Sequence, residues 1–110
     1  MGYKGGALAD QIKLEVSDEF RVWLSSIRDN AVRGRIGARV KRVVSGLLGH
    51  TRSLGGGLEE LKLDFGPGYR VYFARRGNQL VVLLAGGDKS TQSRDIELAR
   101  KVLDRWERRK

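Results

Sequence analysis

The sequence contains no cysteine, a single proline and a single histidine among its 110 residues. Without cysteine, disulfide bonds, thiol catalysis and cysteine-based zinc sites are excluded. No apolar run approaches the roughly 20 residues that span a bilayer, and the N-terminus has no signal-peptide core. Walker loops, dinucleotide fingerprints and metal-ligand clusters are also missing. We therefore expect a cytoplasmic protein with no membrane partner, no metal and no other cofactor.

Acidic residues are missing from one long stretch of the chain. The net charge is +9, from 22 basic and 13 acidic residues, yet no acidic residue lies between Asp29 and Glu59. Such a block favours an anionic partner, either nucleic acid or an acidic protein segment, and a plain solvated helix face is the alternative. The block also holds His50, which as a lone loop histidine is more often an exposed polar residue than a catalytic base.

Hydrophobic periodicity predicts one α+β domain over residues 10–110, after a flexible N-terminus at residues 1–9. Alternation predicts a strand at residues 12–16, and helical spacing predicts helices over residues 18–29 and from about residue 31 onward. The short break between these helices implies an antiparallel hairpin packed on a sheet. Gly34 and Gly37 each weaken the second helix by about 1 kcal/mol relative to alanine, so we expect them to allow close approach to the first. A last helix carries apolar residues from Ile96 to Trp106.

Three consecutive antiparallel strands are predicted between Leu58 and Gln92, after a loop at residues 49–57. Because side chains alternate along a strand, Lys62 on the first strand shares a polar face with Arg70 and Tyr72 on the second. Two cations and a tyrosine on one sheet face indicate a polyanion site. The structural alternative for Arg70 is a cross-strand ion pair with Glu60 or Asp64.

Several segments of this chain together resemble a known family. They are Trp23-Leu24, Asp29, Leu58-Glu59-Glu60-Leu61-Lys62-Leu63, Gly66-Pro67-Gly68-Tyr69-Arg70-Val71-Tyr72-Phe73, Leu83-Leu84-Ala85-Gly86-Gly87-Asp88-Lys89-Ser90-Thr91-Gln92 and Asp95-Ile96. With the order strand, helix hairpin, β-meander and C-terminal helix, they resemble the RelE/ParE superfamily of bacterial toxins. More narrowly, they resemble its HigB-like "addiction module killer protein" branch. The resemblance runs from about Ile12 into the last helix.

This resemblance implies the toxin of a type II toxin–antitoxin system, in which a helix-turn-helix antitoxin is the partner and the only link to operator DNA. RelE-like members cleave mRNA on the ribosome, as metal-independent endoribonucleases that use the 2′-hydroxyl of the RNA itself. Carried over by position, Arg70 would stabilise the phosphate, Lys62 would be a second cation or a proton-transfer group, and Lys89 a third cation. Tyr72 would stack on a base, and the residues gripping ribosomal RNA would be Arg33, Arg35, Arg39 and Arg42.

Two other functions fit the same resemblance. A ParE-like inhibitor of DNA gyrase shares the fold and acts by protein binding, without needing the cationic sheet face. A toxin that has lost toxicity would serve as a corepressor with its antitoxin. The cations on one sheet face favour the nuclease.

Overall fold

The computed structural model describes residues 12–46 and 51–109. Its elements, in chain order, are β1 (Lys13–Val16), α2 (Asp18–Ser26), α3 (Asn30–Val44), β2 (Thr51–Gly55), β3 (Leu58–Lys62), β4 (Arg70–Arg76), β5 (Leu80–Gly87), a 3-10 turn (Lys89–Thr91) and α4 (Gln92–Arg108). The five strands form one sheet in the order β1-β5-β4-β3-β2. β1 runs parallel to β5, and the other neighbours are antiparallel. The predicted α+β fold, with an N-terminal strand, helix hairpin, meander and C-terminal helix, is confirmed.

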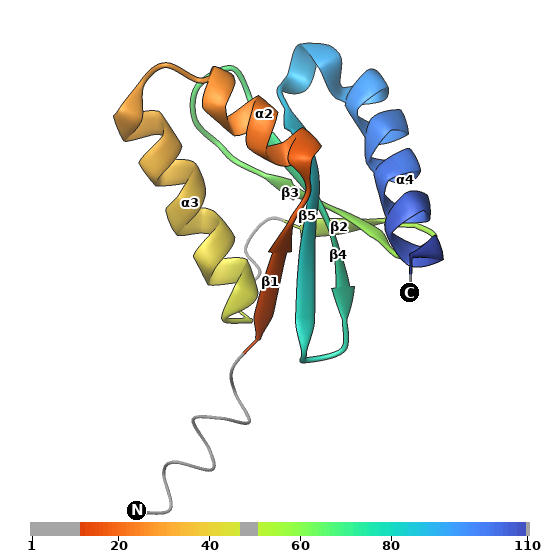
Figure 1. Ribbon diagram of the computed structural model, residues 1–110. Helices are drawn as coiled ribbons and strands as arrows, with labels where there is room; N and C mark the ends of the chain where they lie inside the picture. Colours follow the sequence, from red (N-terminus) through yellow and green to blue (C-terminus); the bar gives the residue numbers. More distant parts are fainter. Residues whose placement is uncertain (1–11, 47–50, 110) are drawn as a thin grey trace, which may run out of the picture.

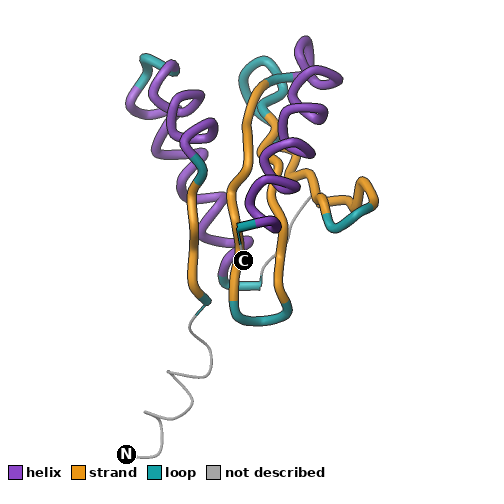
Figure 2. Tube along the Cα trace, turned by 45° about the vertical axis from the view of Figure 1, so that its right-hand side comes forward, coloured by secondary structure: helices purple, strands orange, loops and turns teal. Residues whose placement is uncertain are grey.

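Helices cover both faces of this sheet (Figures 1 and 2). On one face, α2 and α3 pack through Phe20, Ile36 and Val40 against inward residues of the sheet such as Val71 and Phe73. On the other face, α4 packs a second apolar cluster that contains Leu58, Tyr72, Leu84, Ala99, Val102 and Leu103. On the face that alternation marked as polar, Tyr72 is therefore covered by α4, whereas Lys62 is exposed.

Side-chain caps fix where α2 and α3 begin. The Ser17 hydroxyl accepts a hydrogen bond from the Phe20 backbone N–H at 3.0 Å and donates one to the Leu84 carbonyl at 2.8 Å. The Asp29 carboxylate accepts a bond from the Ala31 backbone N–H at 2.8 Å. A capping residue lies outside its helix, so Asp29 belongs to neither helix. Helix α2 ends at Ser26, and its predicted end at residue 29 is wrong.

The structure corrects two predictions that were based on glycine residues, one about the segment 49–57 and one about the second helix. The predicted loop at residues 49–57 contains strand β2, which pairs with β3 through a bulge between Ser53 and Gly55. Gly34 and Gly37 are exposed, and a Cβ on either would meet nothing within 4 Å, so neither serves close packing. His50 and residues 1–9 lie outside the described residues.

Close approach occurs instead at the end of β5. A Cβ on Gly86 would lie 2.2 Å from the Trp23 ring of α2. A Cβ on Gly87 would lie 1.7 Å from a carboxylate oxygen of Asp95 in α4. Consecutive residues of a strand face opposite ways, so the two glycines admit one helix on each side of the sheet.

None of the helices in residues 12–46 and 51–109 combines the length and the apolar character needed to span a membrane.

Candidate functional site

A groove of 430 Å³ opens at the end of the sheet next to the start of α4. Its lining comes from β2, β3, β4 and the first residue of α4, and consists of Thr51, Arg52, Glu60, Lys62, Arg70 and Gln92. Strand pairing brings these residues together, because Arg52 lies opposite Glu60 and Lys62 lies opposite Arg70. Three cations thus converge from three neighbouring strands. A surface of this kind suits an anionic ligand.

A buried carboxylate lies at the centre of the groove wall. Glu60 is 3% exposed. One of its oxygens accepts a hydrogen bond from Arg52 Nε at 2.9 Å, and the other accepts one from Gln92 Nε2 at 2.6 Å. Arg70 Nε lies 3.9 Å from that second oxygen. The ion pair considered for Arg70 and Glu60 is therefore present, and it is part of a network that includes a second arginine.

Arg70 is 6% exposed and is held from its other side by the turn that precedes it. Its Nη1 donates a hydrogen bond to the Gly68 carbonyl at 2.6 Å, whereas its buried Nε has no hydrogen-bond partner among residues 12–46 and 51–109. Gly68 has a φ of +81°, and a Cβ there would lie 3.1 Å from Arg70 Nη1 and 3.2 Å from Lys89 Cβ. Glycine at this turn lets Lys89 lie beside Arg70. The three predicted cations, Lys62, Arg70 and Lys89, are thus brought to one end of the sheet, and both lysines are exposed.

Tyr72 is 0% exposed, so the prediction that it stacks on an RNA base is wrong for this structure. Its ring belongs to the apolar cluster beneath α4, which alternation along one strand did not reveal. Within the described part of the chain, the hydroxyl makes no hydrogen bond of good geometry. Burial first, and then the nearby carboxylates of Glu60 and Asp95, raise the pKa of the Tyr72 phenol far above its ordinary value. Tyr72 is a neutral core residue beneath the groove.

Most of the arginines predicted to grip RNA have partners within the chain. Arg33 donates hydrogen bonds to the Ile27 carbonyl and the Asn30 side chain, and so holds the junction of α2 and α3. Both Arg35 and Arg39 reach the connection between β3 and β4. The Arg35 guanidinium lies 3.9 Å above the centre of the Phe65 ring, and Arg39 Nη1 lies 3.7 Å from Asp64 Oδ1.

The fourth arginine, Arg42, is exposed on α3, as is Arg35 on its outer side. α3 therefore both presents positive charge and supports the turn that carries Arg70.

Sequence reasoning missed three groove residues, Thr51, Arg52 and Gln92. Arg52 belongs to the basic block, but the composition of residues 49–57 predicts a loop there, which hides its position opposite Glu60. Gln92 closes the motif that begins at Gly86, and the role of its amide follows only from where α4 starts. The sequence signal that could have identified Gln92 is a polar residue at the predicted start of a helix, next to a strand end that carries cations.

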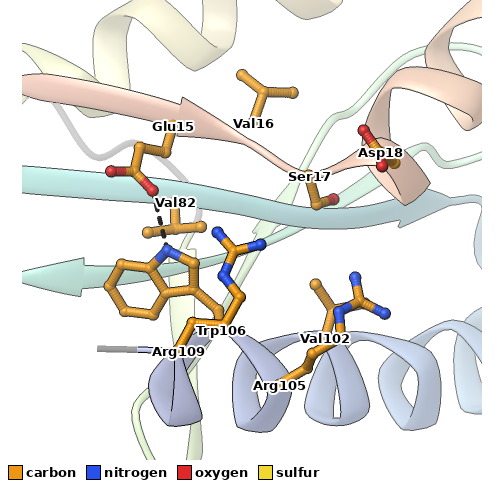
Figure 3. Close-up of a pocket in the computed structure, with 9 residues that line it drawn as sticks. All are labelled: Glu15, Val16, Ser17, Asp18, Val82, Val102, Arg105, Trp106 and Arg109. Carbon is orange, nitrogen blue, oxygen red and sulfur yellow. Dashed lines mark hydrogen bonds between the residues drawn. The ribbon is translucent and has the colours of Figure 1, made fainter.

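A second and smaller cavity, of 120 Å³, lies between β1 and α4 (Figure 3). Two of its α4 side chains donate hydrogen bonds to carboxylates of the N-terminal elements. Trp106 Nε1 donates a hydrogen bond to Glu15 at 2.9 Å (Figure 3). Arg105 donates one to Glu19 at 2.8 Å, and this bond lowers the pKa of the Glu19 carboxyl. These contacts fasten α4 to the N-terminal strand and helix, so we assign the ligand site to the larger groove.

Comparisons with known proteins support a family and a fold. Residues 23–107 match the family model described as "Phage derived protein Gp49-like (DUF891)". An uncharacterized protein of Haemophilus influenzae is 42% identical over 89 residues, covering 81% of this chain and 90% of that protein. The free-state structure of a mutant of the E. coli toxin RelE is similar with a TM-score of 0.59 and 15% identity, covering 79% of this chain and 96% of that one.

Proposed function

The chain belongs to the Gp49-like (DUF891) phage-derived family and has the fold of RelE, and from this premise we propose that it is the toxin of a toxin–antitoxin pair. The RelE/ParE fold predicted from the sequence is confirmed, whereas the narrower HigB-like assignment stays a prediction. The target that the groove suits best is RNA, and the proposed activity is cleavage of mRNA on the ribosome.

The convergence of Arg52, Lys62 and Arg70 on one groove, with Lys89 beside them, carries this proposal. When the 2′-oxygen of a nucleotide attacks the adjacent phosphorus, the bond to the 5′-oxygen of the next nucleotide breaks. A 2′,3′-cyclic phosphate and a free 5′-hydroxyl result. Negative charge accumulates on the phosphate oxygens during this step, and fixed cations aimed at those oxygens supply the largest rate effect.

Proton transfer is the other requirement of this reaction. The 2′-hydroxyl loses a proton as it attacks, and the departing 5′-oxygen gains one. Lys62 is exposed in the groove, directly opposite Arg70. We assign donation of a proton to the departing 5′-oxygen to the Lys62 ammonium, with solvent water accepting the 2′-hydroxyl proton, and we assign the main phosphate contact to Arg70, with Lys89 as a further cation.

The exposed arginines of α3 provide a second, sequence-independent contact. Arg35 and Arg42 are exposed in the part of the chain that carries no acidic residue. We propose that they contact ribosomal RNA, while Arg33 and Arg39 act through the structure that they hold. The partner that neutralises the toxin is a cognate antitoxin of the helix-turn-helix type, and operator DNA is reached only through it.

The test is a cell-free translation reaction in which the ends of a reporter mRNA are mapped by primer extension. Lys62→Ala is the informative variant, because an exposed side chain can be removed without opening the core. Lys101→Ala, an exposed lysine of α4 that does not line the groove, is the matched control. We expect new ends within the translated region for the wild type and Lys101→Ala. Cleavage by Lys62→Ala should be weaker by about 100-fold, within the range for loss of acid–base catalysis.

Intact mRNA with the wild-type protein would refute the nuclease proposal. A gyrase supercoiling assay run in parallel then distinguishes the two remaining functions. Inhibition of supercoiling would identify a ParE-like toxin, and its absence would leave the corepressor.

A further inference from the structure

We propose that Glu60 is a positioning residue of the groove, which sets the Arg52 and Arg70 guanidiniums and the Gln92 amide in the arrangement that receives an RNA phosphate. This inference rests on the proposed function for the identity of the ligand. It concerns a different property, namely the order of the groove before the ligand arrives.

The contacts of Glu60 tie three elements together. The carboxylate belongs to β3, its Arg52 partner to β2 and its Gln92 partner to α4. Arg70 of β4 lies beside the oxygen that accepts from Gln92. Arginine side chains have many rotamers, and a fixed acceptor removes that freedom before binding. Glu60 thereby pre-organises the Arg52 guanidinium through a hydrogen bond, and its charge attracts the Arg70 guanidinium 3.9 Å away.

A carboxylate in this place has an electrostatic cost for an anionic ligand. It offsets one of the positive charges that line the groove, and a phosphate would bind a groove without it more tightly. Its effect on the reaction has the opposite sign, because a cation that is misplaced by about 1 Å can lower the rate by about 100-fold. Loss of the Glu60 charge should therefore separate binding from cleavage.

The same contacts argue against a direct proton-transfer role. A general base must come within hydrogen-bond distance of the hydroxyl that it deprotonates. Glu60 is 3% exposed, and each of its oxygens already accepts a hydrogen bond. It acts through Arg52, Arg70 and Gln92.

The test uses the full chain and three variants. Glu60→Gln removes the charge and keeps the shape. The double variant Glu60→Gln/Gln92→Glu exchanges donor and acceptor across the same hydrogen bond. Glu59→Gln removes the neighbouring carboxylate, which does not line the groove, and is the matched control.

Three quantities are measured for each protein. Affinity is measured with a single-stranded RNA whose 2′-hydroxyl is absent at the scissile position, so that no cleavage occurs. Cleavage is measured as a single turnover on ribosomes programmed with mRNA. The order of the groove is measured by NMR, as the protection from hydrogen exchange of the Arg52 Nε–H.

We expect Glu60→Gln to lower the Arg52 Nε–H protection, because the one neutral amide oxygen that remains is a weaker acceptor than a carboxylate. The variant should bind the RNA at least as tightly as the wild type and cleave about 10- to 100-fold more slowly. The double variant should recover part of the cleavage rate. Glu59→Gln should match the wild type in all three measurements.

Wild-type cleavage or intact Arg52 protection in Glu60→Gln would overturn the inference. So would a slow double variant whose Arg52 protection is restored, because the carboxylate at Glu60 would then be needed for its own chemistry. Failure of the proposed function is distinguishable: wild-type protein would neither bind nor cleave RNA, while the lower Arg52 protection in Glu60→Gln would still be observed.

Discussion

The salt dependence of RNA binding tests the groove quantitatively. Four cations lie at this end of the sheet, Arg52, Lys62, Arg70 and Lys89, and the Glu60 carboxylate offsets one of them. About three phosphate charges can then be neutralised. Each contributes about −0.7 to the slope of log K against log salt for a single strand, which gives a slope of about −2. A tenfold rise in salt should weaken binding by about 100-fold.

Removing the two exposed lysines should change this slope in steps. Lys62→Ala or Lys89→Ala should make it shallower by about 0.7, and the double variant by about 1.4. The assay is fluorescence anisotropy of a short, non-cleavable RNA at a series of salt concentrations. A short strand limits contact with α3. Lys101→Ala controls for net charge and should leave the slope unchanged. The same slope in the wild type and the double variant would show that the RNA binds elsewhere.

Two further predictions concern stability and are measured by urea unfolding. Gly34→Ala and Gly37→Ala should each raise the unfolding free energy by about 1 kcal/mol. A methyl group meets nothing within 4 Å at either site, and alanine favours the helix. An unchanged unfolding free energy would contradict the absence of packing contacts at these two positions. Tyr72→Phe should leave that free energy unchanged or raise it by about 1 kcal/mol, because it removes a buried hydroxyl without a good hydrogen bond. Since burial raises the pKa of Tyr72, the folded state holds this proton more tightly than the unfolded chain does. The unfolding free energy of the wild type should therefore fall as the pH rises above about 10, and that of Tyr72→Phe should fall less. An equal fall in both proteins would contradict the assignment of Tyr72 as a buried, neutral phenol.

The sequence predicted those parts of the fold whose signal is local. Alternation at residues 12–16 and helical spacing in the three helices depend only on neighbouring residues, and in the structure Ser17 and Asp29 cap the starts of α2 and α3. Strand β2 is not predicted because it lies within the glycine-rich segment 49–57, whose composition is that of a loop. Its strand conformation comes from pairing with β3, a tertiary effect that overrides propensity.

The candidate site was predictable only as far as strand register allows. Alternation placed Lys62 and Arg70 together, and the structure pairs them directly. The same rule predicts Tyr72 on that face, but it cannot show which part of the face α4 covers and which part solvent reaches. Whether a residue on one strand face lies in the groove or in the core thus depends on where α4 starts, and α4 lies far along the chain. For the same reason Gln92 could not be assigned to Glu60, whereas Arg52 could not be assigned because its pairing with Glu60 depends on strand β2.

The parallel pairing of β1 with β5 has a consequence for the order of folding. Ser17, directly after β1, hydrogen-bonds to Leu84 of β5 across a separation of 67 residues. The antiparallel strands from β2 to β5 follow one another closely along the chain and can form with short loop closures. Long-range parallel contacts form more slowly than local ones. During synthesis, β1 must therefore wait until β5 has left the ribosome, so the nascent chain cannot complete its sheet until most of it has been translated.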